Sequence, residues 1–383
     1  RNKPVKWLLR SEVDADFIKT NVPYFHAEIS SVSFNNEIEV ENGILTDLTK
    51  KITKKAIGFI QADMHDVGGK RHPLLLKSKA LGKEVLDGLH FMASNVSVGL
   101  ADILAKHYEV LEYKDNHTKE IAVYEALQHI GYPFMPILYG TKKDSEREMY
   151  LILMERLASE NMLLINSEST PEKWTLPIIK KTIDSIHLVH TNFTYETNKI
   201  ESIAPFDIEK VLELYTAFVA LNRKDYDYLI ADHRFDELTG FINDWSTNGY
   251  QPKSKLTLIH NDFNPRNIAI RANGDPCIYD WELATYGIPQ RDIFELLAFT
   301  LSPNFESSDA IAVLKYHFKQ AQSLNNQDYS WSDYLYDFKL GGQAFLVSRV
   351  NFYLTGSILM NYPFIERVFA TSFKILDLLK KTT

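Results

Sequence analysis

Apolar and polar residues alternate from Ala56 to Met64, which predicts a β-strand because successive side chains of a strand point to opposite faces. Gly68-Gly69 then precedes the apolar run Pro73 to Lys77, so the two segments are predicted to form a hairpin. Further strands are predicted over Val32 to Ile38 and over Met149 to Met154. The first part of the chain is therefore predicted to be rich in strands.

Helical periodicity begins at Thr118, where apolar residues recur every three or four positions until Gly131 and Pro133 close the segment. A second helix is expected around Ile179 to His190, which carries apolar residues on one face. Long aromatic-rich helices are expected from Tyr334 to Met360. A strand-rich part followed by a helical part predicts the α+β class.

The change from strands to helices predicts two lobes. We expect a strand-rich N-lobe with one key helix over 1–154, a hinge over 155–158, and a helical C-lobe over 159–383.

Composition narrows the class of protein. The chain has 383 residues, a net charge of −8 and 45% hydrophobic residues, which is typical of a globular protein and gives no basic excess for binding nucleic acid. Its single cysteine, Cys277, excludes an internal disulfide and suits a cytoplasmic location. No apolar run approaches the roughly 20 residues that span a bilayer. The chain starts at Arg1 without Met, which leaves a removed leader segment open.

Candidate chemistry is concentrated in Leu258 to Ile270 and Cys277 to Glu282. An apolar strand leads into a polar loop, and a short strand pair follows it, so that Asp262, Asn267 and Asp280 can converge. Carboxylate and amide oxygens of this kind suit Mg²⁺, which also binds substrate phosphates. A solvated turn is the alternative interpretation of such a polar loop.

The pattern His-x-Asp-x-x-x-x-Asn, from His260 to Asn267, followed by Asp280-Trp-Glu, resembles the aminoglycoside phosphotransferase and choline kinase family. The resemblance implies a two-lobed protein-kinase-like fold that acts as one catalytic unit, with the catalytic loop, the metal site and the acceptor pocket in the C-lobe. It also implies that Asp262 is the catalytic base, that Asn267 and Asp280 hold Mg²⁺, and that Asp292 braces the catalytic loop.

In the N-lobe, the resemblance places Lys77 where the family has the lysine that touches the nucleotide phosphates, and Glu120 where it has the glutamate that pairs with this lysine. Lys79 and Glu125 are the nearest competitors for these two roles. Each of these charges would otherwise be read as a solvated surface group.

Two further segments are assigned to nucleotide binding. The loop Asn42 to Thr49 holds one glycine, and its Thr46 or Thr49 is a candidate phosphate contact. The alternative is that this segment is a plain turn. Met154 to Leu157 resembles the linker that meets the base of ATP or GTP, which makes Glu155 and Leu157 candidate nucleotide contacts; the alternative is the end of a strand.

The predicted function is transfer of the γ-phosphate of ATP or GTP to a hydroxyl group of an antibiotic or metabolite. A choline, ethanolamine or amino-alcohol kinase is the alternative; a protein kinase is disfavoured because only 12 positions lead from Asp280 to Asp292. A catalytically dead module is disfavoured because the lysine, the base and the metal ligands are all present.

The expected partners are a nucleotide and a hydroxylated small molecule, with no nucleic acid and no membrane span. The acceptor pocket is expected after residue 300, where aromatic residues are frequent: Trp331, Tyr334, Tyr336, Phe345, Phe352, Tyr353 and Tyr362.

Overall fold

A computed structural model describes residues 6–35, 46, 49–50, 53–227, 229–326 and 328–381. The chain divides into two compact units. The first unit comprises Arg1–Leu89, Glu112–Met162 and Cys277–Glu282, and the second comprises His90–Leu111, Leu163–Pro276 and Leu283–Thr383. This division differs from the single boundary expected at 155–158, because each unit is assembled from segments that lie far apart in the sequence.

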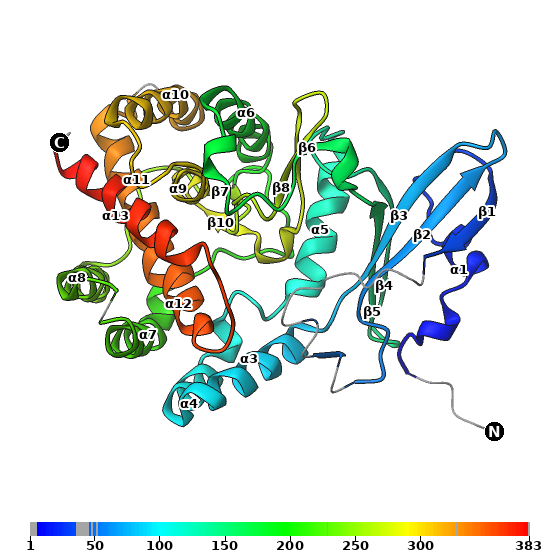
Figure 1. Cartoon of the computed structure of the whole chain (residues 1–383), viewed down its shortest axis with the longest axis horizontal. Helices are drawn as coiled ribbons and strands as arrows, with labels where there is room; N and C mark the ends of the chain where they lie inside the picture. Colours follow the sequence, from blue (N-terminus) through cyan, green and yellow to red (C-terminus); the bar gives the residue numbers. More distant parts are fainter. Residues whose placement is uncertain are drawn as a thin grey trace. The chain divides into compact units, whose positions relative to one another are not determined.

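The first unit is built on a five-stranded antiparallel sheet (Figure 1). Its strands lie in the order β1 (Ile29–Phe34), β2 (Gly58–Asp66), β3 (Arg71–Ser78), β5 (Met149–Glu155) and β4 (Leu138–Asp144). The predicted hairpin is confirmed as β2 and β3. The first strand begins at Ile29, earlier than the predicted Val32, and positions 36–38 of the predicted strand lie outside the described residues.

Helix α5 (Asn116–His129) is the predicted N-lobe helix, and it is confirmed. Ile121, Tyr124 and Leu127 on its apolar face are fully buried. Gly131 closes the segment with a φ of 66°, a left-handed conformation that glycine adopts without steric cost. The shorter α1 (Ala15–Thr20) belongs to the same unit.

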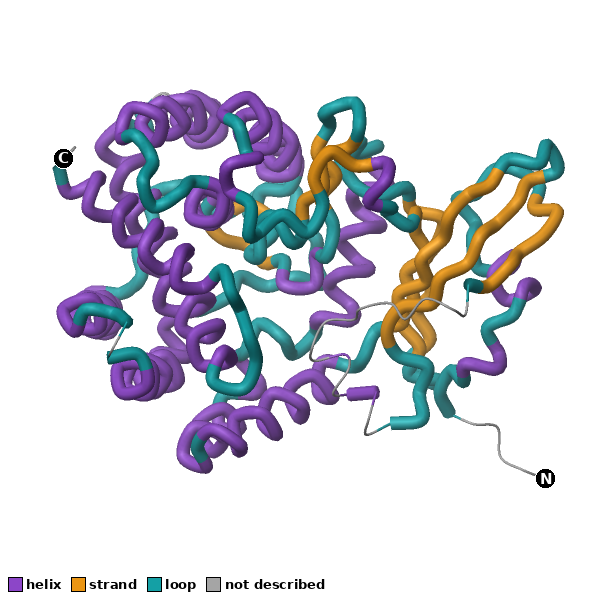
Figure 2. The backbone as a smooth tube through the Cα atoms, viewed as in Figure 1, coloured by secondary structure: helices purple, strands orange, loops and turns teal. Residues whose placement is uncertain are grey.

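The second unit is mainly helical (Figure 2). The predicted helix around Ile179 to His190 is confirmed as α6 (Leu176–Asn192). The predicted aromatic-rich stretch forms α11 (Trp331–Phe345), a π-helical turn over Leu346–Val350, and α12 (Asn351–Ser357). The other helices of this unit are α4 (Val98–Lys106), α7 (Leu212–Asp225), α8 (Asp232–Asn248), α9 (Pro289–Thr300), α10 (Ser307–Asn325) and α13 (Ile365–Lys380). The remaining elements are α3 (Gly82–Val96), β6 (Met162–Leu164), β7 (Thr257–Ile259), β8 (Ile268–Arg271), β9 (Pro276–Ile278) and β10 (Thr285–Gly287).

A small antiparallel ladder in the second unit determines where its polar loop begins. Thr285 of β10 pairs with Ile259 of β7, and the loop starts immediately after Ile259. Two residues beyond β10, α9 begins at Pro289, which suits the first turn of a helix because proline has no N–H group to leave unbonded. The ladder therefore brings the start of the loop close to the N-terminus of α9.

Close packing of α9 against α11 holds this helix in place. A Cβ atom added to Gly342 would lie 2.2 Å from the ring of Phe294, so no side chain fits there without a shift. Phe294 also packs against Phe338, with ring centroids 5.2 Å apart. The glycine is thus required for the close approach of the two helices.

The strand-rich and helical units confirm the predicted α+β class. In the part of the chain that the structure describes, no helix is both long enough and apolar enough to cross a membrane.

Candidate active site

A buried ion cluster in the first unit is centred on Glu120. Lys77 on β3 donates from Nζ to Glu120 Oε1 at 2.8 Å and to Asp280 Oδ1 at 2.6 Å. Glu120 lies in α5 and is fully buried, so its charge must be compensated within the protein. The structure therefore brings together three residues that the sequence singled out.

Lys79 binds the same glutamate. Its Nζ lies 2.6 Å from Glu120 Oε2, and it also pairs with Glu282. Lys77 and Lys79 are two positions apart on one strand, which places both side chains on the same face of the sheet. The two lysines are therefore members of one cluster, in which each occupies one oxygen of Glu120.

Glu125, the competitor of Glu120, lies outside this cluster. It accepts hydrogen bonds from Thr141 at 2.7 Å and from Lys143 at 2.8 Å, and its side chain is one-third exposed. Glu120 and Glu125 occur five positions apart on α5, so they face different sides of the helix.

Asp280 is held by its backbone as well as by Lys77. Its φ of 63° lies in the left-handed region, which aspartate and asparagine tolerate better than most residues. Its N–H donates to Tyr124 Oη at 3.2 Å. One carboxylate oxygen from each of Glu120, Asp280 and Glu282 lies within 4.8 Å of the others, and such a set of oxygens fits a hard divalent cation.

The neighbouring carboxylates keep Lys77 protonated. Burial alone would lower the pKa of Lys77, but the negative charges of Asp280, Glu120 and Glu282 outweigh it, so the pKa lies well above its ordinary value. Lys77 is therefore a permanent positive charge next to the candidate metal ligands.

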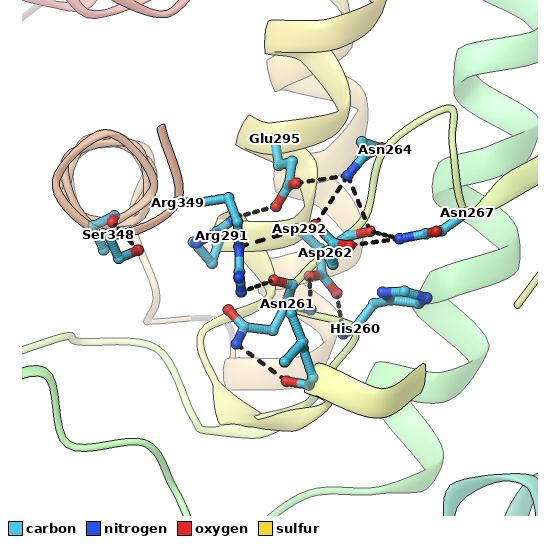
Figure 3. A network of polar contacts seen from close by, with 12 residues as sticks. His260, Asn261, Asp262, Asn264, Asn267, Arg291, Asp292, Glu295, Ser348 and Arg349 are labelled. Carbon is cyan, nitrogen blue, oxygen red and sulfur yellow. Dashed lines mark hydrogen bonds and ion pairs between the residues drawn. The ribbon is translucent and has the colours of Figure 1, made fainter. Parts of the chain in front are cut away.

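The polar loop after β7 is built around Asp262 (Figure 3). Asn267 donates from Nδ2 to Asp262 Oδ2 at 2.7 Å and to the Asp262 backbone oxygen at 2.8 Å. Asn264 donates to Asp262 Oδ1 at 3.1 Å, and Tyr353 Oη donates to the same oxygen at 3.3 Å. With its nitrogen bound to Asp262, Asn267 has its carboxamide oxygen to offer to a metal ion.

Asp292 in the first turn of α9 braces this loop, as the resemblance implies. Its carboxylate accepts the N–H groups of His260 at 2.8 Å and of Asn261 at 2.9 Å (Figure 3). It also pairs with His190 at 3.2 Å. Asn261 has a φ of 62°, which turns the chain between these two bonds and Asp262. Two backbone bonds to one buried carboxylate thus determine the position of the loop.

Two arginines form long ion pairs with the Asp262 carboxylate. Arg266 and Arg349 each have a side-chain nitrogen 3.9 Å from Asp262 Oδ1. Burial alone would raise the pKa of Asp262, but the charges of Arg266 and Arg349, with that of His260, lower it below the ordinary value. Asp262 is therefore ionised at neutral pH and accepts a proton only from a group activated beside it.

Glu295 on α9 completes the network behind the loop. It accepts hydrogen bonds from Asn264 at 2.9 Å and from Arg291 at 2.6 Å (Figure 3). It is fully buried, and burial raises the pKa of this carboxyl group despite the charge of Arg291. Glu295 thus orients Asn264, which in turn holds Asp262.

The four remaining candidates lie in the first unit. Thr46 and Thr49 are helical where a loop was expected, and Thr49 is buried beside Gly88 of α3, which gives this short segment a packed side. Residues 42–45, 47 and 48 of the predicted phosphate loop lie outside the described residues.

Glu155 is the last residue of β5. The N–H group of Glu155 donates to the oxygen of Ile137 at 2.8 Å, and that of Arg156 donates to the oxygen of Pro73 at 3.1 Å. These two groups therefore serve the sheet. Contacts of Glu155 and Leu157 with a nucleotide base stay a prediction, as does phosphate binding by Thr46 and Thr49.

Sequence reasoning named Lys79 only as a competitor of Lys77, and it gave no role to Glu282 or Arg349. Glu282 stands in the recognised Asp-Trp-Glu motif, so it had a signal that could have identified it. Arg349 had none, because it lies 87 positions after Asp262 in the sequence and reaches the loop only through the π-helical turn after α11.

The aromatic residues proposed for an acceptor pocket divide into two groups. Tyr334 and Phe345 are fully buried and pack with other aromatic side chains, as Trp331 does by stacking on Tyr334. Tyr353 instead lies beside the polar loop and contacts Tyr362, with ring centroids 5.3 Å apart. Most of the first group is therefore core, whereas the second borders Asp262.

A family model described as the phosphotransferase enzyme family, APH, matches residues 93–323, which is more than half of the chain. The chain therefore belongs to this phosphotransferase family, and the predicted family is confirmed. No curated protein matches the sequence.

Solved structures with low sequence identity resemble the whole chain. A choline kinase, LicA, from Streptococcus pneumoniae is 12% identical, with a TM-score of 0.46 over 94% of this chain and 98% of that one. An aminoglycoside phosphotransferase from Alicyclobacillus acidocaldarius is 10% identical, with a TM-score of 0.48 and 95% of each chain covered. An ethanolamine kinase of Plasmodium vivax is 13% identical, with a TM-score of 0.48 over 92% of this chain and 83% of that one.

Proposed function

We propose that this chain is a small-molecule kinase that transfers the γ-phosphate of ATP or GTP to a hydroxyl group. The observation that carries the proposal is the setting of Asp262, an ionised carboxylate held by two carboxamides and a phenol, on a loop braced by Asp292. Such a group can orient a hydroxyl and accept its proton. Membership of a phosphotransferase family supports the same reaction.

In this proposal each residue has one task. Asp262 Oδ1 or Oδ2 accepts the proton of the acceptor hydroxyl as its oxygen bonds to the γ-phosphorus and the bond to the leaving nucleoside diphosphate breaks. Lys77, fixed by Glu120, supplies a positive charge to the nucleotide phosphates. The reaction therefore depends on positioning and charge, for which these residues suffice.

The residues present fit a divalent cation. Asp280 and Asn267 would hold Mg²⁺, and the carboxylates of Glu120 and Glu282 lie next to Asp280. When bound, the ion neutralises charge on the phosphates during transfer. The metal role of Asp280 requires Lys77 to share or release a carboxylate that it now binds at 2.6 Å.

The chain between Asp280 and Asp292 favours a small acceptor over a peptide. It forms a short 3-10 turn over Trp281–Leu283, then β10, and enters α9 at Pro289. Since β10 is paired with β7 residue by residue, this segment has no length left to build a docking platform for a peptide. A catalytically dead module is also disfavoured, because the lysine and glutamate pair is formed.

The test is release of ADP or GDP by the purified chain with a panel of hydroxylated metabolites and antibiotics. We expect release that requires both Mg²⁺ and an acceptor, and a new phosphate ester detectable by mass spectrometry. Asp262→Asn should lower kcat by about 10²–10⁴-fold while nucleotide affinity stays nearly unchanged, because a neutral amide cannot accept the proton. An Asp262→Asn enzyme with full activity would refute the assignment.

A further inference from the structure

Two arginines lie beside Asp262, and the side chain of Arg266 is the more exposed of the two. It is 26% exposed, against 15% for Asp262 and 4% for Arg349. A terminal nitrogen of Arg266 lies 3.9 Å from Asp262 Oδ1, although its hydrogen bonds are made elsewhere. A molecule whose hydroxyl reaches Asp262 therefore meets a guanidinium group beside it.

The guanidinium group of Arg266 is held in a defined orientation. Its Nε donates to Asn264 Oδ1 at 3.4 Å, and a terminal nitrogen donates to Tyr353 Oη. Its Cζ atom lies 4.8 Å from the ring centroid of Tyr353 and 5.1 Å from that of Phe364. Tyr362 packs against both rings. A side chain fixed in this way loses little further entropy when it binds a ligand.

Carboxylates around Asp262 are buried and already bonded. Glu295 is fully buried and holds Asn264 and Arg291, and Asp292 is fully buried and accepts two backbone N–H groups. Neither can reach a ligand at the loop. In the described residues of this unit, the charge presented next to the base is therefore the positive charge of Arg266.

Resting on the proposed function, we propose that the acceptor is a hydroxylated acid whose carboxylate binds Arg266 while its hydroxyl binds Asp262. A guanidinium group attracts a carboxylate by its charge, and a terminal N–H group of Arg266 beyond those given to Asn264 and Tyr353 can donate to it. Because the two protein groups are 3.9 Å apart, the hydroxyl and the carboxylate of the acceptor lie a few covalent bonds from each other. An ammonium group in the same position would face a like charge, which disfavours amine acceptors such as choline or ethanolamine.

The experiment compares acids and amines built on similar carbon chains or rings: glycerate against aminopropanediol, gluconate against glucamine, and glucuronate against glucosamine. Release of ADP or GDP with Mg²⁺ gives kcat/KM for each, and the shift of Tm in the presence of a non-hydrolysable nucleotide reports binding without turnover. We expect at least one acid to be turned over, or to raise Tm, more than its amine partner. The inference is overturned if amines are turned over, or raise Tm, more than their acid partners. It is also overturned if no acid is turned over or raises Tm.

Substitutions then assign the preference to Arg266. Arg266→Ala should lower kcat/KM for the acid by about 10- to 100-fold, which is the range for loss of a charge-assisted hydrogen bond. Arg266→Lys should restore part of it, and Arg266→Glu should shift the preference toward the amine, a change that a purely structural role would not produce. An acid-to-amine ratio that stays constant in Arg266→Glu overturns the inference.

Arg234 offers a matched control in the same unit. It is 22% exposed, lies with Cζ 4.5 Å from the ring centroid of Phe373, and pairs with Asp377 at 2.6 Å. Arg234→Ala should leave the acid-to-amine ratio unchanged. The proposed function fails by a different result, namely no Mg²⁺-dependent nucleotide binding and no turnover with any acceptor, acid or amine.

Discussion

The two units hold their principal carboxylates in opposite ways. Asp280 of the first unit makes a direct ion pair with Lys77 at 2.6 Å and is 36% exposed. Asp262 of the second unit is 15% exposed, accepts hydrogen bonds from the carboxamides of Asn264 and Asn267, and has longer ion pairs of 3.9 Å with Arg266 and Arg349. A residue in the left-handed conformation positions each carboxylate: Asp280 itself in the first case, and Asn261, next to Asp262, in the second.

The difference corresponds to two chemical tasks. A carboxylate paired with a lysine can exchange that partner for a metal ion, since both partners are simple positive charges. A carboxylate held by amides keeps its orientation and its charge, and its proton affinity is lowered by the charges of the neighbouring arginines. The first arrangement suits a metal ligand, and the second suits a base.

Substitution of each carboxylate by its amide tests this contrast most strongly. Asp280→Asn should abolish Mg²⁺-dependent nucleotide binding, because an amide is a poorer ligand than a carboxylate for a hard cation. Asp262→Asn should retain that binding and lose turnover. Titration calorimetry with nucleotide, with and without Mg²⁺, separates the two outcomes.

Asp275→Asn is the control for this comparison, because Asp275 is an exposed residue of the hairpin turn that pairs with Lys181. Asp275→Asn should change neither Mg²⁺-dependent nucleotide binding nor turnover. Equal loss of nucleotide binding in Asp280→Asn and Asp262→Asn would remove the distinction between ligand and base.

The buried cluster of the first unit is expected to matter for stability as well. Glu120→Gln leaves Lys77 and Lys79, both largely buried, without their shared charge, and should lower the free energy of unfolding by about 3–5 kcal/mol. Glu125→Gln removes a partly exposed pair with Lys143 and should cost at most about 1 kcal/mol. Urea denaturation of the two variants measures the difference, and similar losses would show that burial of the cluster contributes little.

Each unit also contains a histidine that burial keeps neutral. Burial lowers the pKa of His117 in the first unit to about 4, and burial with the charge of His190 lowers that of His187 in the second to about 4. The unfolded chain takes up these protons near pH 6.5, whereas the folded chain does so only near pH 4. Stability is therefore complete above pH 6.5 and falls by up to about 3 kcal/mol per histidine as the pH decreases to 4.

His117→Gln and His187→Gln should each flatten this decline, whereas substitution of the exposed His233 should not. Urea denaturation at a series of pH values between 4 and 7 measures the slope. A slope unaffected by both substitutions would show that neither histidine is coupled to folding.

Much of the fold was predictable because its signals are local. Alternation predicted β2, spacing of three and four predicted α5, and the glycine pair predicted the turn after β2. The assignment of 277–282 to the first unit was not predictable, since it depends on tertiary contacts of a segment more than a hundred residues from the rest of that unit. The helical conformation at Thr46 and Thr49 was missed for the same reason, because packing of Thr49 beside α3 accompanies it.

The sequence by itself indicated the phosphotransferase family, because the order and spacing of His260, Asp262, Asn267 and Asp280 form a local signature that resembles it, and the family model covers these residues. Only the tertiary structure decided the surroundings of those groups. Charge on Asp262 depends on Arg349, which comes from a distant helix, and the charge of Lys77 depends on burial around Glu120. Electrostatic energies are set by distance and by exclusion of water, and neither can be read from the order of residues along a chain.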